Sequence, residues 1–138
     1  MNSGYLLDTC TAIWMTTREP LAEKAVAALA DAKAAGQPVF VSAITAWEMA
    51  MLLARGRIRE TKTAEQWYSD FRLEAQIEEQ PVTARIFMSS CSLPQPLHKD
   101  PIDRILIATA RQNDLTIITR DRAILNYGVA GYVRTLAC

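Results

Sequence analysis

The sequence predicts an α/β fold in which a central sheet of five parallel strands lies between two layers of helices, giving three layers in all. Five short runs rich in β-branched and aliphatic residues are bounded by Gly, Pro or polar residues, as strands usually are. Helical patterns fill the gaps between these runs. Strands that alternate with helices indicate a parallel sheet covered on both faces, so the fold class follows from this alternation.

The five expected strands are short. They are residues 4–9 (GYLLDT), 38–43 (PVFVSA), 77–82 (IEEQPV), 115–120 (LTIITR) and 132–137 (YVRTLA). The second and the fourth are apolar almost throughout, which is typical of strands buried on both faces of a sheet. One clear loop, SLPQPLHKD at residues 92–100, is stiffened by Pro94 and Pro96.

Start and stop signals delimit the expected helices. The expected ranges are 20–35, 43–55, 63–76, 83–93, 101–112 and a short helix at 121–127, with another helix beginning near Thr11. The first two ranges end at Gly36 and Gly56, as helices often do, and the third opens with the capping-box spacing from Thr63 to Gln66.

Length and charge restrict the classes of function. A chain of 138 residues suits one domain, residues 1–138, which is large enough to bury a core without disulfides or a structural metal. The 15 Lys and Arg residues balance 15 Asp and Glu residues, so no overall field indicates a nucleic-acid or membrane partner. Eleven of the basic residues are Arg, which suits phosphate recognition but also ordinary surface ion pairs.

The cysteines and the apolar runs predict a cytoplasmic protein. Cys10, Cys91 and Cys138 lie far apart without a CxxC pair, so we expect neither a disulfide framework nor a zinc site. The N-terminal residues lack the basic start and apolar core of a signal peptide. The most apolar stretch, residues 39–54, is interrupted by Glu48 and is too short for a membrane span, so we expect no membrane contact.

Four acidic residues are placed where a ligand would bind. Ligands of such folds bind beyond the carboxyl ends of the strands. Asp8 ends the first expected strand and Asp121 follows the fourth, while Glu48 lies in the helix after the second. Asp103 opens the helix that leads into the fourth strand. The sequence therefore predicts that four carboxylates lie near one edge of the sheet, at the carboxyl ends of the strands.

Helix capping offers an alternative explanation for several acids. Asp8 and Asp121 each suit the N-cap of the helix that follows, and Arg120 and Arg122 beside Asp121 then count as solvated charges. Pro101 marks a helix start so firmly that Asp100 becomes its cap, which leaves Asp103 for another purpose.

Glu48 and the convergence of charge favour a cation site. Glu48 stands in a helix that is otherwise apolar on nearly every side, where a charged residue needs a partner. Four converging carboxylates repel one another unless a cation is held among them. Ligation by oxygen alone favours Mg²⁺ or Mn²⁺, whereas zinc prefers His or Cys, and we interpret the single His98 as a loop or surface residue.

Four segments in register carry a resemblance that spans nearly the whole chain. They are YLLDTCTAIW (5–14), VSAITAWEMAMLLARGRI (41–58), LHKDPIDRILIATA (97–110) and LTIITRDRAIL (115–125). With these motifs the chain resembles the PIN-domain ribonucleases and is most similar to the VapC toxins of bacterial toxin–antitoxin pairs.

The resemblance implies a fold, an activity and a set of site residues. It implies a PIN-like fold whose first strand is central and beside the fourth. It implies a Mg²⁺-dependent endoribonuclease, also supported by Mn²⁺, that inhibits growth or translation until an antitoxin neutralises it. The metal-centred acids of the family match Asp8, Glu48, Asp103 and Asp121. Thr119 matches a hydroxyl residue before the last acid, and Asp100 matches a less general position.

The resemblance also implies partners. These are a VapB-type antitoxin, an RNA substrate, a second copy in a homodimer, and operator DNA only through the antitoxin. The candidate RNA-binding residues are basic: Arg55, Arg57, Arg59, Lys99, Arg104 and Arg122. Several aromatic residues are candidates for the protein interfaces, although a core position is the simpler expectation for each: Trp14, Trp47, Trp67, Tyr68 and Phe71.

Other classes compete with the toxin hypothesis. A phosphotransfer domain also has an Asp after its first strand, but LLDTCTA lacks a second Asp two residues later and no Lys ends a later strand. A PIN nuclease outside a toxin–antitoxin pair remains an alternative. So does a non-catalytic interaction module whose acids only cap helices, and such a module would show no stabilisation by Mg²⁺ or Mn²⁺. No motif identifies the target RNA.

Overall fold

Five parallel strands form one sheet in the order β3-β2-β1-β4-β5. The computed structural model describes residues 3–94 and 100–138. The strands are β1 (Tyr5–Leu7), β2 (Val39–Ser42), β3 (Glu78–Gln80), β4 (Thr116–Thr119) and β5 (Arg134–Ala137). The predicted five-stranded parallel sheet is confirmed, and β1 lies at its centre beside β4 as the resemblance implied.

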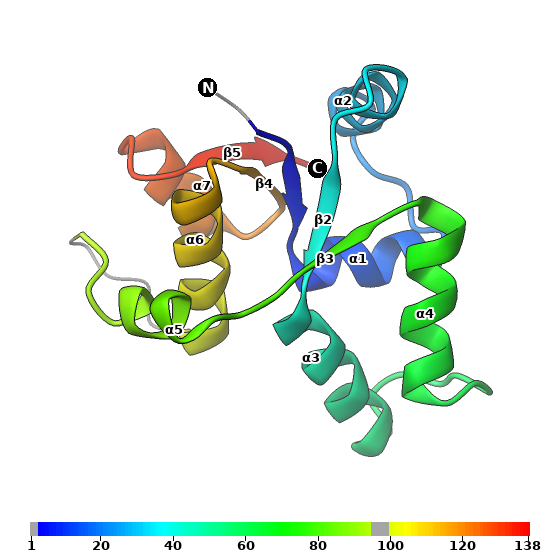
Figure 1. Ribbon diagram of the computed structural model, residues 1–138. Coiled ribbons are helices and arrows are strands. Elements are labelled where there is room, and N and C mark those ends of the chain that lie inside the picture. Colours follow the sequence, from blue (N-terminus) through cyan, green and yellow to red (C-terminus); the bar gives the residue numbers. More distant parts are fainter. Residues whose placement is uncertain (1–2, 95–99) are drawn as a thin grey trace.

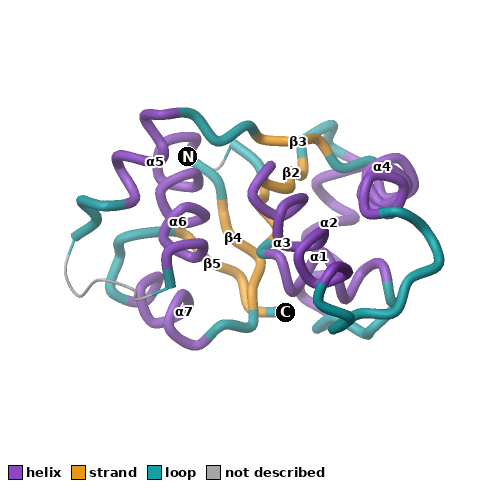
Figure 2. The backbone as a smooth tube through the Cα atoms, turned by 90° about the horizontal axis from the view of Figure 1, so that it is seen from below, coloured by secondary structure: helices purple, strands orange, loops and turns teal. Residues whose placement is uncertain are grey.

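Helices cover both faces of this sheet, so the predicted three layers are confirmed (Figure 1; Figure 2). The helices are α1 (Thr9–Thr16), α2 (Glu23–Ala34), α3 (Ala43–Ala54), α4 (Ala64–Ala75), α5 (Ala84–Ser90), α6 (Pro101–Asn113) and α7 (Arg122–Val129). Figure 2 shows α5, α6 and α7 on one side of the strands and α1, α2 and α4 on the other. None of the helices within the described residues is long and apolar enough to cross a membrane.

The central strand divides the apolar core into two parts. Leu6 packs with the helices α5, α6 and α7, whereas its neighbour Leu7 packs with α1, α2 and α4. Ile117 and Ile118 of β4 alternate in the same way, and all four side chains are fully buried. Alternate residues of a strand point to opposite faces, so a strand buried on both faces must be apolar at every position.

Several helix boundaries differ from the expected ones; most shift by one residue, and the helix expected near Thr11 begins at Thr9. The helix expected from residue 20 begins at Glu23, because the backbone N–H of Ala22 donates to the Cys138 oxygen at 3.0 Å and holds the preceding residues in an extended path. The helix expected to end at residue 93 ends at Ser90, and the last helix continues past Tyr127 to Val129. The start of α2 thus depends on a contact between distant segments, which local sequence signals do not record.

Gly128 lets α7 pack closely on β5. A Cβ atom added to Gly128 would lie 2.4 Å from Oγ1 and 2.8 Å from Cγ2 of Thr135. No side chain fits in this space unless Thr135 moves, so α7 reaches its position because residue 128 is glycine. The position of α7 matters because Asp121 lies at its N-terminus.

We expect Gly128→Ala to lower the free energy of unfolding by about 1–2 kcal/mol through overpacking against Thr135. In a Thr135→Ala background the same change should be neutral or stabilising, because alanine is favoured over glycine in a helix by about 1 kcal/mol. Urea unfolding of the two single variants and the double variant measures the coupling. An equal cost in both backgrounds would contradict the close contact.

Candidate active site

Pairing of β1 with β4 places the first and last predicted acids side by side. Leu7 pairs with Ile118, and the Asp8 N–H donates to the Ile118 carbonyl at 3.1 Å. The Thr119 hydroxyl donates to Oδ2 of Asp8 and accepts the backbone N–H of Asp121 at 2.9 Å. One hydroxyl group therefore links the two strand ends that carry these acids.

All four predicted acids line one cavity of about 330 Å³ at the carboxyl ends of the strands. Asp8 and Asp121 follow β1 and β4, Glu48 comes from α3, and Asp103 comes from the first turn of α6. Its described lining residues are Asp8, Thr9, Cys10, Trp14, Glu48, Asp100, Asp103, Arg120 and Asp121. The structure thus gathers five carboxylates from four segments that are far apart in the sequence.

Helix capping accounts for part of this arrangement. Asp8 accepts the Thr11 N–H at 3.1 Å and caps α1, and Asp121 accepts the Ile124 N–H at 2.9 Å and caps α7. Asp100 caps α6 through the Ile102 N–H at 2.9 Å, as Pro101 at the first position predicted. A carboxylate has two oxygens with several acceptor sites, so an aspartate that caps a helix keeps sites for a further partner.

Two buried hydroxyl groups hold Glu48, and sequence reasoning missed both. The Thr9 hydroxyl donates to Oε1 of Glu48, and it lies 2.8 Å from the Thr45 hydroxyl. Thr9 and Thr45 are almost or fully buried. Thr9 belongs to α1 and Thr45 to α3, so this pair joins the two helices at the edge of the cavity. The Thr9 hydroxyl is therefore the hydrogen-bond partner that the sequence led us to expect for the charged Glu48.

Burial and mutual repulsion make the acids of the cavity hard to ionise. Burial raises the pKa of Asp103 to about 7, with further contributions from Asp100, Asp121, Asp8 and Glu48 in that order. Burial also raises the pKa of Asp8, against the hydrogen bond from Thr119. The pKa of Glu48 is raised by burial as well, against the hydrogen bond from Thr9. The cavity therefore favours a bound positive charge.

The pKa of the Cys10 thiol is also affected by the excess of negative charge in the cavity. Its pKa is raised to about 11, chiefly by burial and then by Asp8, Glu48, Asp103 and Asp121. A thiolate is therefore disfavoured in this cavity, which places the negative charge on oxygen ligands alone.

The predicted RNA-binding residues that the structure describes lie outside the lining of this cavity. None of Arg55, Arg57, Arg59, Arg104 and Arg122 is among the described residues that line it. Arg55, Arg57 and Arg59 are exposed after α3, Arg122 is exposed at the start of α7, and Arg104 is half-buried on α6. Lys99 and His98 lie outside the described residues. Arg120, which lines the cavity, was not among the predicted contacts.

The aromatic residues are mostly in the core, as expected, with one exception. Trp67 and Phe71 are 4% and 6% exposed, and Trp14 and Tyr68 pack partly buried against the same core. The core position expected for Trp47 is wrong, since 54% of this residue is exposed. Thr45 and Met49 are the buried residues of α3. Because Trp47 is two residues from each, about 200° around the helix axis, it faces outward.

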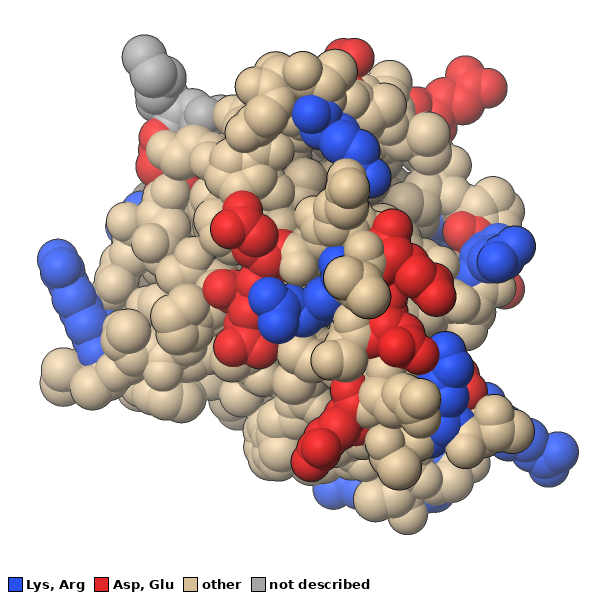
Figure 3. Space-filling model, turned by 45° about the vertical axis from the view of Figure 1, so that its right-hand side comes forward, with Lys and Arg blue, Asp and Glu red and all other residues tan. Residues whose placement is uncertain are grey.

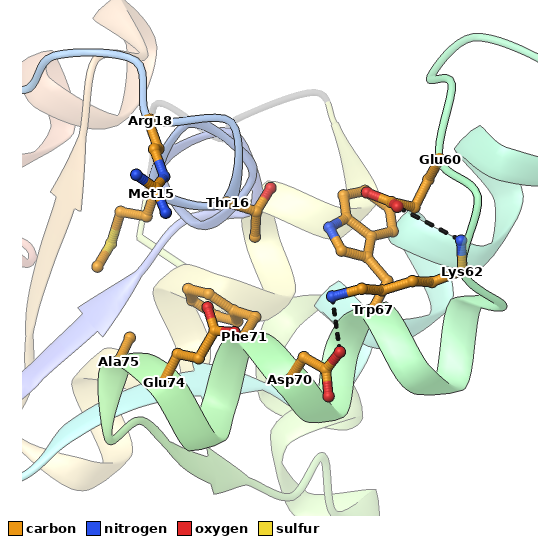
Figure 4. Close-up of a pocket in the computed structure, with 10 residues that line it drawn as sticks. All are labelled: Met15, Thr16, Arg18, Glu60, Lys62, Trp67, Asp70, Phe71, Glu74 and Ala75. Carbon is orange, nitrogen blue, oxygen red and sulfur yellow. Dashed lines mark hydrogen bonds and ion pairs between the residues drawn. The ribbon is translucent and has the colours of Figure 1, made fainter.

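A second hollow, of about 390 Å³, lies between the end of α1 and α4 (Figure 4). Trp67 and Phe71 of α4 and Met15 of α1 line it. At its rim Lys62 forms an ion pair with Asp70 at 2.7 Å. Its lining has three acidic residues against two basic ones, so this hollow lacks the large excess of carboxylates found at the strand ends.

Comparisons with known proteins agree with this architecture. The family model described as PIN domain matches residues 5–129. The comparison with curated proteins found no match. VapBC2 from Rickettsia felis, solved bound to a promoter DNA fragment, is similar with a TM-score of 0.70 and 16% identity over 98% of each chain.

Two further solved structures are similar over nearly their full length. VapBC-5 from Mycobacterium tuberculosis, a member of the VapBC family of toxin–antitoxin systems, has a TM-score of 0.63 and 19% identity over 99% of each chain. FitAcB from Neisseria gonorrhoeae has a TM-score of 0.59 and 26% identity over 96% of each chain. At the identities of the Rickettsia and Mycobacterium structures, the likeness shows the fold alone.

Proposed function

The chain belongs to the PIN-domain family, and from this premise we propose that it is the nuclease toxin of a toxin–antitoxin pair. The proposed reaction is endonucleolytic hydrolysis of single-stranded or looped RNA, dependent on Mg²⁺ and also supported by Mn²⁺. The observation that carries the proposal is the cavity at the strand ends, where five carboxylates gather and burial raises the pKa of Asp103 to about 7.

The donor groups of this cavity fit a hard divalent cation. Carboxylate oxygens are the ligands that Mg²⁺ prefers, and Mg²⁺ is usually bound through one or two carboxylates while it keeps several waters. No group of three or more His, Cys, Asp or Glu side chains within residues 3–94 and 100–138 is spaced to hold a metal ion. As the resemblance implied, we assign Asp8 and Asp103 as the chief ligands, directly or through water, while Glu48 and Asp121 complete the shell or orient the attacking water.

Each acid has a distinct part in the proposed reaction. When bound, the cation supplies charge that polarises the scissile phosphodiester and acidifies water. Asp8 and Asp103 would hold the cation. Glu48, fixed by Thr9, and Asp121, fixed at the start of α7, would orient the attacking water and accept its proton.

The solved neighbours support the proposal of a protein partner. The similar structures from Rickettsia felis and Mycobacterium tuberculosis are complexes of toxin–antitoxin type, the first with promoter DNA. We propose a VapB-type antitoxin as the partner of this chain, with operator DNA bound only through it. We also propose a homodimer, because Trp47, Phe87 and Met88 are large apolar residues that are about half or more exposed.

Incubation of the purified protein with total RNA and Mg²⁺ tests the proposed activity. We expect new RNA ends that disappear with a chelator and with the Asp8→Asn variant, and mapping these ends identifies the target. A matched single-stranded DNA should stay intact. RNA that is cut equally by the Asp8→Asn variant would refute the assigned site.

One observation favours a non-catalytic alternative. Asp8, Asp100 and Asp121 each cap a helix, so capping alone accounts for three of the five carboxylates. A protein whose acids only cap helices should show no change in melting temperature with Mg²⁺ or Mn²⁺. A PIN nuclease outside a toxin–antitoxin pair would bind metal and cleave RNA but bind no antitoxin.

We expect Thr119→Val to weaken Mg²⁺ binding by about 10- to 100-fold, the range seen when a group supporting a metal ligand is removed. The Thr119 hydroxyl donates to Asp8 and accepts the Asp121 N–H, and valine keeps the shape of the side chain without these bonds. The Mg²⁺ concentration at half-maximal cleavage measures the effect. Thr119→Ser keeps the hydroxyl and should stay within a few-fold of the parent, so equal losses in both variants would contradict the role of this bond.

A further inference from the structure

Arg120 is the only Lys or Arg among the described residues that line the acidic cavity. It lies between Thr119 and Asp121, at the end of β4, so it enters the cavity wall from the same segment as two residues of the proposed site. The sequence suggested a solvated charge at this position. The structure instead gives its guanidinium group a defined place.

Three contacts fix the guanidinium plane of Arg120. Its Nε donates to the Cys138 backbone oxygen at 2.9 Å, and its Nη2 donates to the Pro20 carbonyl at 2.5 Å. Its Cζ lies 4.1 Å from the centre of the Trp14 ring, which also lines the cavity. These two hydrogen bonds use two of the five N–H groups that a guanidinium carries. The orientation of the others is therefore set before any ligand arrives.

The charge of the surroundings shows what such a group would recognise. A phosphodiester that enters a cavity with five carboxylates is repelled unless positive charge receives it. The protein has no net charge, and on the face in Figure 3 acidic and basic side chains are interspersed instead of forming one broad basic patch. Long-range attraction of nucleic acid is therefore weak, and phosphate recognition depends on a few local groups.

We infer that Arg120 is a substrate-binding residue that holds a phosphate of the RNA backbone at the edge of the acidic cavity. A planar guanidinium with fixed orientation presents parallel N–H donors that match two phosphate oxygens, and fixing it beforehand reduces the entropy lost on binding. Trp14 supports the group from one face, and the carbonyl oxygens of Pro20 and Cys138 hold its edge. The inference rests on the proposed function, because it names how the same cavity takes its substrate.

RNA binding by a variant that does not cleave provides the direct test. In an Asp103→Asn background, anisotropy of a fluorescein-labelled single-stranded oligoribonucleotide gives Kd at several salt concentrations. We expect Arg120→Ala to raise Kd about 10-fold or more, as loss of a charged hydrogen bond does. We also expect the slope of log Kd against log salt to fall by about 0.7, the contribution of one phosphate contact to a single strand.

Arg111→Ala is the matched control. Arg111 also donates to a backbone carbonyl, that of Tyr132, but it lines a hollow at the opposite end of β4. Its loss should leave Kd and the salt slope within about two-fold of the parent. If Arg120→Ala behaves like Arg111→Ala in both measurements, Arg120 has only a structural role and the inference is wrong.

Arg120→Lys decides the outcome if Arg120→Ala does not fold. Lysine keeps the charge but not the planar pair of donors, so we expect the salt slope to be retained and Kd to rise about 3- to 10-fold. A lysine variant that binds as tightly as the parent would overturn the role of the fixed guanidinium.

The KM for RNA cleavage, measured in Arg120 variants with Asp103 intact, should rise in parallel with Kd. Absence of any cleavage by the wild-type protein would refute the proposed function itself, whereas normal cleavage with unchanged KM in the Arg120 variants refutes only this inference.

Discussion

Replacement of Asp103 by asparagine is expected to reduce RNA cleavage about 10³-fold or more. The change removes one of the two carboxylates proposed to hold the cation. The charge of that cation stabilises the transition state by several kcal/mol. The fold should survive, since Asp103 is neither the cap of α6 nor part of the core. Single-turnover cleavage of a labelled RNA at saturating Mg²⁺ measures the loss.

Asp31→Asn controls for the change of a carboxylate to an amide. Asp31 is exposed on α2 and does not line the cavity, so its variant should cleave like the parent. Substantial cleavage by Asp103→Asn at saturating Mg²⁺ would show that Asp103 is not a ligand. Equal losses in the two variants would point to damage to the fold.

Without metal, the protein is expected to lose stability as the pH rises from about 4 to 8. The pKa of Asp103 is raised from 3.8 to about 7 in the folded state, so the protonated carboxyl favours folding. This contribution is complete below pH 3.8 and is lost as the pH rises through about 7. The pKa values of Asp8 and Glu48 are raised too and act in the same direction.

Asp103→Asn should therefore stabilise the metal-free protein at pH 8 while it abolishes activity. The raised pKa corresponds to about 4 kcal/mol before screening, and contact with solvent reduces this to about 1–2 kcal/mol. The expected gain in melting temperature is about 3–8 °C. Thermal unfolding in a chelator, at pH 5 and pH 8, checks both signs.

Addition of Mg²⁺ at pH 8 separates charge repulsion from other causes. The ion should raise the melting temperature of the wild-type protein and have much less effect on Asp103→Asn, since binding to the folded state stabilises it. The hydrogen bond from Arg134 lowers the pKa of Asp114, so that carboxyl titrates below this pH range. A metal-free wild-type protein that is more stable at pH 8 than at pH 5 would contradict the raised pKa values of these buried carboxyls.

Local signals in the sequence predicted the class of fold and the start of α6 well. Alternation of apolar strands with helices is a local pattern, and it sufficed for the parallel sheet. Asp100 and Pro101 act within one turn of helix, so their roles as cap and first residue followed from spacing alone. The central place of β1 beside β4 came from the resemblance, because this pairing joins residues more than a hundred positions apart.

The support around the acids was not predictable in the same way. Thr9 and Thr45 meet only because α1 packs beside α3, and neither residue carries a sequence signal that distinguishes it from an ordinary buried threonine. Arg120 depends on three partners from distant segments, so local sequence left it a solvated charge. Both are contacts of tertiary packing, which the pattern along one chain does not record.

The shared use of aspartate as helix cap and site residue has an evolutionary consequence. Asparagine caps a helix about as well as aspartate does. Exchange of Asp121 for asparagine should therefore keep the start of α7 while it removes the charge proposed to act in the reaction. For the proposed nuclease toxin, this one conservative exchange would remove the activity and leave the fold and the rest of the surface unchanged. Selection would then silence the protein without unfolding it, and the proposed antitoxin would still bind.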